Sequence, residues 1–575
     1  MSATTTGPVS TDPVSFGIAL AELGTAIARN PERALDAWAG FSADLAAAAS
    51  DTVGRALGAD EPPTLSPLPK DRRFADPSLS QNPWFFGQRQ AYLAWSRFMH
   101  NLGGAADLDQ RTAQKAAFAV GMIVDALAPT NFAASNPAAI RKAFETEGES
   151  LRKGLENFLD DMAVNGGKPR QVDASGFELG VNLAATPGKV VFRNHLMELI
   201  QYAPTTETVH EVPLILSPPW INRYYVMDLA PGRSFAEWAV DHGHTTFAIS
   251  WRNPPQHDEA QHDEAEGGEV DTMRDVGLDD YMLGGLGTAV DVVREICGVP
   301  QVNVAGLCVG GTLAVMLLAW QAQTEAQTAE RAVPPVRSLT LLNTLVDFSQ
   351  PGALAAFTDP ATVDRLEKRM AERGYLEGSE MAGTFDALRP NDLIWNYVAG
   401  NWLMGQTPPA FDILAWNSDS TRIPAATHAA YLRSFYVENR LATGTMTRGG
   451  RRLHLDDIES DVYVLAASED HITPWKSSYA TVGLLACPIR FVLSSAGHIA
   501  GIVNPPGPRR VHWTNDDLPL NPDEWRGAAT EVPGTWWGDW AAWIEPRAGD
   551  HRPPPPMGSA THPALIDAPG TYVGG

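Results

Sequence analysis

Cys308 stands in a setting that would make a cysteine a nucleophile. It is part of the hexapeptide GLCVGG at 306–311, between a short apolar run at 302–305 and an apolar helical stretch at 312–320. Strand, sharp turn and helix in this order form a nucleophile elbow, here with Cys in place of Ser. A side chain at Gly306 or Gly310 would collide with the neighbouring strand or helix. The alternative is a buried structural cysteine beside flexible glycines.

The elbow predicts how the surroundings of Cys308 would assist it. We expect the thiol to stand exposed above the sheet, with the aligned peptide dipoles of the following helix favouring the thiolate. The backbone N–H of Val309 would bind a developing oxyanion. A second donor is expected near Ile221, in the loop that follows an apolar run at 212–216. Asn222 and Arg223 in the same loop could reach ligand, although a surface role fits Arg223 equally well.

Two further residues complete a catalytic constellation. Asp470 lies just past an apolar run at 462–466, and His498 lies just past another at 489–493. A lone Asp or His at a strand end is more often a satisfied polar group. The order nucleophile, acid, histidine is that of the α/β-hydrolase fold, however, and it favours a triad in which Cys308 attacks, His498 is the base and Asp470 is its acidic partner.

The elements that would position this triad belong to an α/β unit. After Gly166, short apolar runs alternate with helical stretches, which predicts a mostly parallel sheet with crossover helices. Predicted strands are 212–216, 245–250, 302–305, 339–342, 462–466 and 489–493. The interval from Asn343 to Asp461 is too long for one crossover, so we predict an inserted cap, about 347–456, over the active site.

A helical region precedes this unit. Residues 13–161 carry Ala, Leu and charged side chains at helical spacing and no nucleophile motif. Within them, the prolines and aromatics of 71–86 suggest an ordered, non-helical segment. The expected division is a helical N-terminal domain at 1–175 and an α/β-hydrolase catalytic domain at 176–575.

Composition narrows the class of protein. A chain of 575 residues is long enough for several compact units, and three cysteines, an odd and sparse set, fit a reducing compartment such as the cytoplasm. No secretory signal and no apolar run long enough to span a membrane is expected. The net charge of -25 argues against nucleic-acid binding. The acidic run at 257–271 is more simply a solvated loop than a metal site, and no metal site is expected.

Several long motifs resemble one family, the polyhydroxyalkanoate synthases, and in particular the single-subunit class I type that prefers short-chain hydroxyacyl-CoA. The resemblance covers nearly all of the chain after about residue 65. The motifs are DRRFADPSLSQNP, TNFAASNP, PPWINRYYVMDLAP, SWRNP, GLCVGGTL, LRPNDLIWNYV, EDHITPW and GHIAGIVNPP. Trp220 departs from the pattern, because a small residue or Cys is expected there, and this puts the shape of the pocket in doubt.

The resemblance implies a function and a set of partners. It implies polymerisation of (R)-3-hydroxyacyl-CoA, with 3-hydroxybutyryl-CoA expected, through an acyl thioester on Cys308. It also places Asn222, Arg389 and His471 near CoA or the reacting thioester. The CoA thioester is the substrate, so no cofactor is expected. The helical region would serve a homodimer and association with the polyester granule surface in the cytoplasm.

The chemistry agrees with these residue types. Exchange of one thioester for another is nearly balanced in free energy, so a thiol nucleophile keeps the acyl group activated for the next step. The hydroxyl of a second acyl unit must then attack while His498 takes its proton. Two alternatives remain open: a thioesterase or polyester depolymerase on the same fold, and a granule-associated protein without activity.

Overall fold

The computed structural model describes residues 13–69, 71–104, 107–256, 273–325, 333–507 and 509–574. The chain forms two compact units. The first contains residues 1–173, 355–362 and 379–410, and the second contains residues 174–354, 363–378 and 411–575. The chain therefore first passes from one unit to the other between Asp173 and Ala174. The acidic run at 257–271 lies outside the described residues.

The N-terminal part of the first unit is helical, as predicted. Its helices are α1 (Pro13–Arg29), α2 (Pro31–Ala56), η1 (Arg72–Phe74), α3 (Ser78–Gln81), α4 (Pro83–Gly104), α5 (Gln110–Ala126), η2 (Pro129–Asn131), α6 (Pro137–Glu145) and α7 (Glu149–Val164). Local signals set their starts: the Asp109 carboxylate accepts hydrogen bonds from the backbone N–H groups of Arg111 and Thr112 at the start of α5.

The prediction of a non-helical segment at 71–86 was wrong. Asp71 caps η1 by accepting from the Arg73 backbone N–H, and α3 and the start of α4 follow at once. Pro83 is the first residue of α4, where a proline has no N–H to lose and its fixed φ suits a helix. The two prolines of this segment, Pro77 and Pro83, therefore lie at the starts of α3 and α4.

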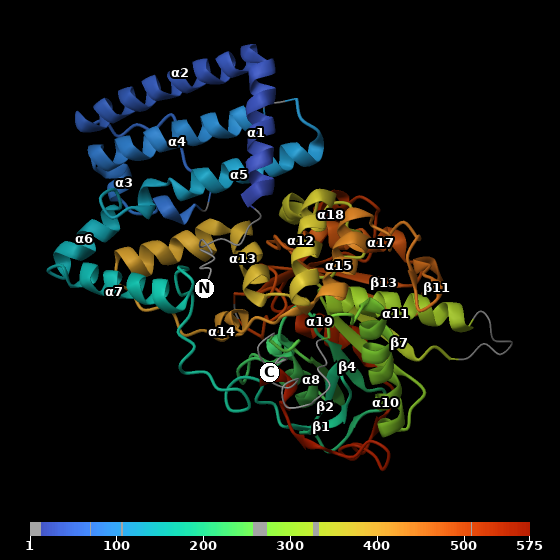
Figure 1. Ribbon diagram of the computed structural model, residues 1–575. Coiled ribbons are helices and arrows are strands. Elements are labelled where there is room, and N and C mark those ends of the chain that lie inside the picture. Colours follow the sequence, from blue (N-terminus) through green and yellow to red (C-terminus); the bar gives the residue numbers. More distant parts are fainter. Residues whose placement is uncertain are drawn as a thin grey trace. The chain divides into compact units, whose positions relative to one another are not determined.

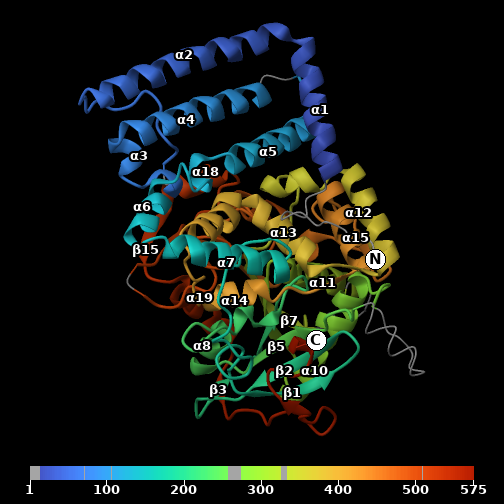
Figure 2. The same cartoon turned by 60° about the vertical axis from the view of Figure 1, so that its left-hand side comes forward.

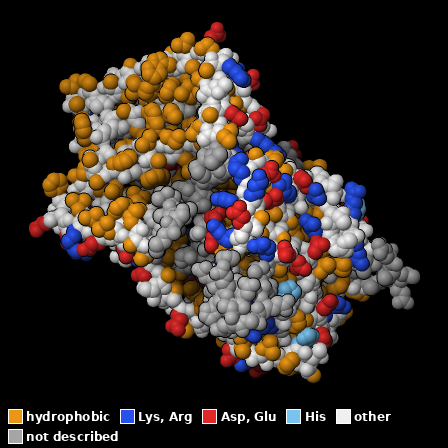
Figure 3. Space-filling model, in the orientation of Figure 1, with side chains coloured by type: hydrophobic (Ala, Val, Ile, Leu, Met, Phe, Trp, Pro, Cys, Tyr) orange, Lys and Arg blue, Asp and Glu red, His pale blue; other side chains and the backbone are white. Residues whose placement is uncertain are grey.

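In the first unit, α2, α4 and α5 lie side by side and α1 runs across their ends (Figures 1 and 2). The shared core is formed by buried residues of several helices, among them Leu23, Tyr92 and Val120. Many large apolar side chains nevertheless remain on the surface of this unit, including Trp38, Leu57 and Trp84. Figure 3 shows hydrophobic side chains spread over one face of these helices.

The long insert is helical, as predicted, but it is divided between the two units. Its elements are η5 (Gly352–Phe357), α12 (Pro360–Arg373), β8 (Tyr375–Leu376), α13 (Gly378–Leu388), η6 (Asn391–Trp395), η7 (Val398–Leu403), α14 (Asp412–Ser418), β9 (Ile423–Pro424), α15 (Ala425–Tyr431), η8 (Leu432–Val437), β10 (Thr447–Arg448), β11 (Arg451–Arg452) and η9 (Leu455–Asp457). Within the first unit, the Trp402 indole N–H donates to Asp161 at 2.8 Å. Residues 411–456 belong to the second unit.

The second unit is built on an 11-stranded sheet within the described residues, in the order β15-β14-β13-β12-β7-β6-β4-β5-β2-β1-β17. Its strands are β1 (Gly188–Arg193), β2 (Met197–Tyr202), β4 (Leu214–Ser217), β5 (Thr246–Trp251), β6 (Val302–Leu307), β7 (Val336–Leu342), β12 (Asp461–Ala467), β13 (Ile489–Ser494), β14 (Val511–Thr514), β15 (Thr530–Pro533) and β17 (Ile566–Asp567). In the middle of the sheet, the neighbouring strands β13, β12, β7, β6, β4 and β5 pair in parallel. All the predicted strands are present, and antiparallel strands extend both ends of the sheet.

Helices cover both faces of the sheet, with α8 (Phe235–Asp241) on one side and α10 (Thr288–Cys297) and α11 (Val309–Glu325) on the other (Figures 1 and 2). Residues 309–319 of α11 are buried without exception, as expected for a helix that is apolar on all sides. The remaining helices are η3 (Tyr224–Met227), η4 (Asp280–Gly287), α16 (Trp475–Tyr479), α17 (Thr481–Leu484), α18 (Pro522–Ala528), α19 (Trp536–Ile544), η10 (Glu545–Arg547) and η11 (Tyr572–Gly574). Across the described ranges, none of the helices has the length and apolarity needed to cross a membrane.

Candidate active site

The turn between β6 and α11 has the geometry of a nucleophile elbow. Cys308 adopts φ +51°, a left-handed backbone conformation that is strained for a residue with a side chain. A Cβ on Gly306 would lie 2.4 Å from the Gly311 Cα, and a Cβ on Gly310 would lie 2.2 Å from the Ser217 carbonyl oxygen. The predicted need for glycine at both positions is confirmed, because backbone on the neighbouring strand and helix occupies the space.

Hydrogen bonds hold the strained turn in place. The Cys308 backbone N–H donates to the Leu342 carbonyl at 2.8 Å, and its carbonyl accepts from the Gly311 N–H at 3.0 Å. The Thr344 hydroxyl donates to the same carbonyl at 3.1 Å. The Val309 N–H follows directly at the start of α11. The thiol is thereby fixed above the carboxyl end of the sheet.

The expectation that Cys308 is exposed was wrong. The residue keeps only 8% of its accessible surface. Part of the insert explains this, because Tyr431 of α15 and Tyr436 of η8 are close enough for charge on Cys308 to raise the pKa of both phenols, on top of the larger effect of their burial. Their hydroxyls lie 3.1 Å apart. Neither tyrosine was identified from the sequence, since their proximity to Cys308 depends on how the insert folds back.

His498 and Asp470 form a buried hydrogen-bonded pair. The His498 Nδ1 lies 2.6 Å from the Asp470 Oδ2. The other Asp470 oxygen accepts from the backbone N–H groups of Ile472 and Thr473 at 2.8 and 2.9 Å, and the Thr473 hydroxyl donates to Oδ2 at 2.7 Å. The Asn343 side-chain amide donates to the His498 backbone carbonyl. Asp470 is thus fixed as an acceptor that orients the imidazole.

The electrostatics of the pair make His498 strongly basic. Burial lowers the pKa of the imidazole, but the Asp470 carboxylate and a hydrogen bond and charge interaction with Cys308 together raise it from 6.5 to about 10. Burial also raises the pKa of Asp470, and His498 and Thr473 outweigh that effect and lower it below its usual value. His498 is therefore held in its imidazolium form at neutral pH, between the Asp470 carboxylate and Cys308.

The other two thiols lack such an environment. Burial raises the pKa of Cys297 to about 12, and burial raises the pKa of Cys487 to about 11. Both thiols therefore remain protonated at neutral pH and are poor nucleophiles. Cys308 is the cysteine whose surroundings suit nucleophilic attack.

The loop after β4 emerges beside the elbow, because β4 and β6 are neighbours and pair Ser217 with Gly306. Ile221 and Asn222 in this loop are partly buried. The Asn222 side-chain oxygen accepts from the Arg223 N–H at 2.8 Å. Arg223 is not at the surface: it is 8% exposed, and its guanidinium pairs with Asp419 at 3.0 Å.

Trp220 and His471, which the sequence analysis also named, lie in the second unit. Trp220 is buried and its ring packs edge-on against Tyr431, with centroids 6.0 Å apart. Since Tyr431 lies near Cys308, Trp220 belongs to the aromatic surroundings of the thiol. His471 is partly buried and directly follows Asp470.

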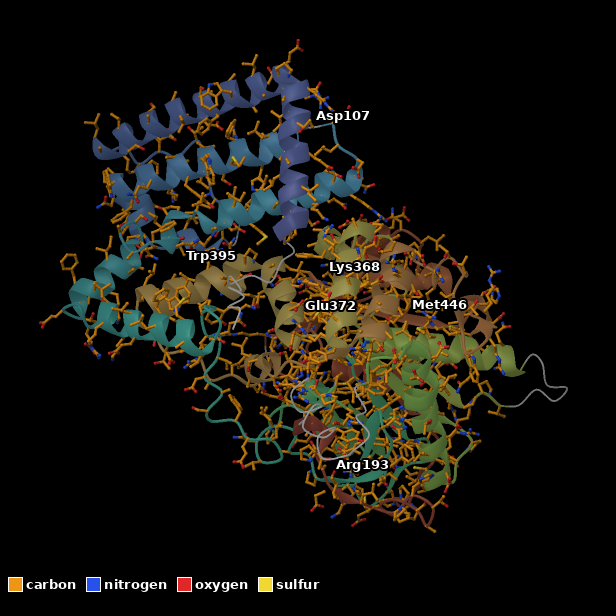
Figure 4. All side chains as sticks on the ribbon, viewed as in Figure 1. Asp107, Arg193, Lys368, Glu372, Trp395 and Met446 are labelled. Atoms are coloured by element: carbon orange, nitrogen blue, oxygen red, sulfur yellow. The ribbon has the colours of Figure 1, made fainter. Side chains whose placement is uncertain are left out.

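Arg389 belongs to the first unit, as does Trp395 of η6, which Figure 4 labels. The Arg389 guanidinium forms an ion pair with Asp392, and both of these side chains are partly exposed. An ion pair of this kind is common between a cationic and an acidic residue one helical turn apart. The expected contact of Arg389 with CoA stays a prediction.

Two family profiles match overlapping parts of the chain. Residues 70–239 match the sequence profile of the poly-beta-hydroxybutyrate polymerase (PhaC) N-terminus, and residues 220–505 match that of the alpha/beta hydrolase fold. A poly(3-hydroxyalkanoate) polymerase of Methylorubrum extorquens is 41% identical over 550 residues, covering 95% of this chain and 87% of the relative. The subunit PhaC of the Cupriavidus necator polymerase is 42% identical over 511 residues, covering 88% and 83%.

Proposed function

Because this chain belongs to the poly(3-hydroxyalkanoate) polymerase family, we propose that it polymerises (R)-3-hydroxyacyl-CoA, with 3-hydroxybutyryl-CoA as substrate, and carries the acyl chain as a thioester on Cys308. The observation that carries the proposal is the buried Asp470–His498 pair, which interacts with a cysteine on a strained elbow. The reaction is acyl transfer by a Cys-His-Asp triad, and the CoA thioester is substrate, so the scheme uses no cofactor.

In the first step, the Cys308 thiolate attacks the thioester carbonyl of the substrate. The carbonyl oxygen becomes negatively charged, and the N–H groups of Val309 and Ile221 are the proposed donors to it. The bond to the CoA sulfur then breaks, and the leaving thiolate takes the proton from the His498 imidazolium. The products are an acyl-Cys308 thioester, free CoA and a neutral His498.

The second step uses the neutral imidazole that the first step leaves behind. The 3-hydroxyl of another hydroxyacyl-CoA attacks the acyl-Cys308 carbonyl while His498 accepts the hydroxyl proton. An ester bond forms, the bond to the Cys308 sulfur breaks, and the thiolate and imidazolium are restored. General-base assistance of this kind contributes about 10² to 10⁴ in rate. The lengthened acyl-CoA can then acylate Cys308 again.

Exclusion of water decides between polymer and free acid. Cys308, Asp470 and His498 are each less than one tenth exposed, and Tyr431 and Tyr436 lie near the thiol. A dry site of this kind protects the acyl thioester from hydrolysis. The bulk of Trp220 beside Tyr431 supports a short acyl group such as 3-hydroxybutyryl.

CoA is a polyanion and requires local donors on a chain with net charge -25. Asn222 and His471 are proposed for this role because both follow strands that end at the same edge of the sheet as Cys308. Arg389 is proposed from its motif, with Asp392 as the partner that it would exchange for a phosphate or carbonyl oxygen.

The first unit is proposed to bind the polyester granule and to serve a homodimer in the cytoplasm. This proposal rests on the many large apolar side chains that are exposed on these helices (Figure 3). So many are unusual on a surface that contacts only water. On α7, exposed Leu151, Leu155 and Leu159 recur every four residues and so share one face of the helix. A polyester surface is apolar enough to cover such a face.

The proposed reaction is tested by mixing purified protein with 3-hydroxybutyryl-CoA and following free CoA, insoluble polymer and free 3-hydroxybutyrate together. We expect CoA and polymer in proportion, with little free acid, and neither product from the Cys308→Ala variant. Free acid without polymer would identify a thioesterase or depolymerase. No CoA release at all would indicate a granule-associated protein without activity.

A further inference from the structure

A second group of ligand-forming side chains lies in the α/β unit. β3 (Val209–His210) pairs with β16 (His551–Arg552) in antiparallel fashion, and His210 stands directly opposite His551. Such partners project from the same face with their Cβ atoms about 5 Å apart. Glu545 opens η10, just before β16. One ligand atom from each of His210, Glu545 and His551 lies within 4.8 Å of the others.

The backbone holds these elements together without help from the three side chains. The N–H groups of Glu211 and Val212 donate to the carbonyls of Asp550 and Ala548, both at 2.9 Å, and the His210 N–H donates to the Gly243 carbonyl at 2.8 Å. The His210 ring is stacked on His244, with centroids 4.6 Å apart. The placement of the three ligands therefore follows from the fold, and the His210 ring plane is fixed.

The donor atoms converge. The His210 Nε2 lies 3.6 Å from the Glu545 Oε2, and the His210 and His551 ring centroids are 4.5 Å apart. The His551 Nδ1 faces the Thr208 hydroxyl at 3.5 Å, which leaves its Nε2 to face a ligand. Tetrahedral coordination at about 2.1 Å places neighbouring donor atoms about 3.4 Å apart. The donor atoms lie within 4.8 Å of one another, so an ion would have to draw the exposed Glu545 and His551 side chains closer to His210.

We propose that His210, Glu545 and His551 bind one divalent transition-metal ion of the zinc class. Two imidazoles and a carboxylate are a ligand set that Zn²⁺ accepts, with water in the fourth position. His210 precedes β4 and Glu545 and His551 pack beside it, so the site lies at the amino ends of the parallel strands, opposite the edge that carries Cys308. The ion would tie the C-terminal segment to the start of the sheet and take no part in acyl transfer.

Zinc binding is tested on the full-length chain without a polyhistidine tag, carrying Cys308→Ala so that the catalytic thiol cannot bind the ion. After dialysis against a chelator, equilibrium dialysis with Zn²⁺ and elemental analysis should give one ion per chain. Added Zn²⁺ should also raise the melting temperature, because the folded state alone holds the three ligands together.

His551→Ala should raise the dissociation constant for Zn²⁺ at least about 100-fold, the upper end of the loss seen when a ligand's outer partner is removed, and abolish the thermal shift. Glu545→Gln should also raise the dissociation constant for Zn²⁺. Because Glu545 is exposed, this variant should fold normally, and it shows whether the loss in His551→Ala is due to misfolding. His562→Ala is the matched control, since His562 pairs with Glu295 at 3.2 Å and no third ligand joins them in the described ranges. Absence of bound Zn²⁺ in the parent protein, or equal binding by His551→Ala, would overturn the assignment.

Discussion

Asp470→Asn removes the charge that makes His498 basic while keeping the shape of the side chain. The remaining oxygen can still accept from the N–H groups of Ile472 and Thr473, but the amide that replaces Oδ2 cannot accept from His498. The rise of the His498 pKa from 6.5 to about 10 corresponds to on the order of 5 kcal/mol in favour of the imidazolium. Asp470 supplies the largest raising contribution, so its loss should remove much of that preference.

Two assays measure the consequence. CoA release from 3-hydroxybutyryl-CoA should fall about 10² to 10⁴-fold in Asp470→Asn, the usual worth of an oriented general base. The pKa of the His498 imidazole, followed by NMR titration, should fall from about 10 toward 6.5, because the Asp470 carboxylate supplies the largest contribution that raises it. Asp412→Asn is the control, since Asp412 is a comparably buried carboxylate that pairs with Arg233. Unchanged CoA release and an unchanged His498 pKa in Asp470→Asn would refute the reasoning.

The same variant has a defined effect on stability. The raised pKa of His498 contributes stability that is complete below about 6.5 and is lost as the pH rises through about 10. The lowered pKa of Asp470 contributes stability that is present above its ordinary value of 3.8 and is lost as the pH falls through its value in the folded protein. In urea unfolding, Asp470→Asn should therefore be most destabilised relative to the parent between about pH 5 and 7. A difference that grows above pH 10 would contradict the assigned ion pair.

Three further changes test other parts of the account. Gly306→Ala should abolish CoA release and lower the free energy of unfolding by about 1–3 kcal/mol or more in urea titration, because the added methyl meets the Gly311 backbone. Arg389→Ala should depress kcat/KM with a change of at most about 1 kcal/mol in stability, since its pair with Asp392 is solvent-exposed, and Arg389→Lys should recover only part; matching losses of stability and activity would mean a purely structural role. Removal of residues 1–173 should lower expression and melting temperature as well as granule binding, because residues 379–410 lose the helices on which they pack; a truncated protein with unchanged turnover and granule binding would contradict the role given to the first unit.

The parallel strands, and the places of Cys308, Asp470 and His498 directly after three of them, could be predicted because their signals are local. Each strand is a short buried run, and Cys308, Asp470 and His498 each follow such a run directly. The antiparallel strands β1, β2 and β14 were not identified. β14 is only partly buried, and β1 carries a register shift between Val190 and Phe192, so neither has a clear pattern of alternation.

Burial and long-range proximity could not be predicted from local patterns. Cys308 was expected to be exposed because an elbow lifts the nucleophile above the sheet, but Tyr431, more than a hundred residues later, lies near it. The division of the insert between two units depends on contacts such as Trp402 with Asp161, which no sequence spacing reveals. His210 and His551 are likewise joined only by the pairing of β3 with β16.

The central claim is that Cys308 carries the acyl chain, and mass spectrometry tests it most directly. The protein is mixed briefly with 3-hydroxybutyryl-CoA, quenched in acid to preserve thioesters, digested and analysed. One or more 3-hydroxybutyryl units are expected on the peptide that contains Cys308, and no adduct is expected in Cys308→Ala. An adduct on Cys297 or Cys487, or CoA release and polymer formation without any adduct on Cys308, would contradict it.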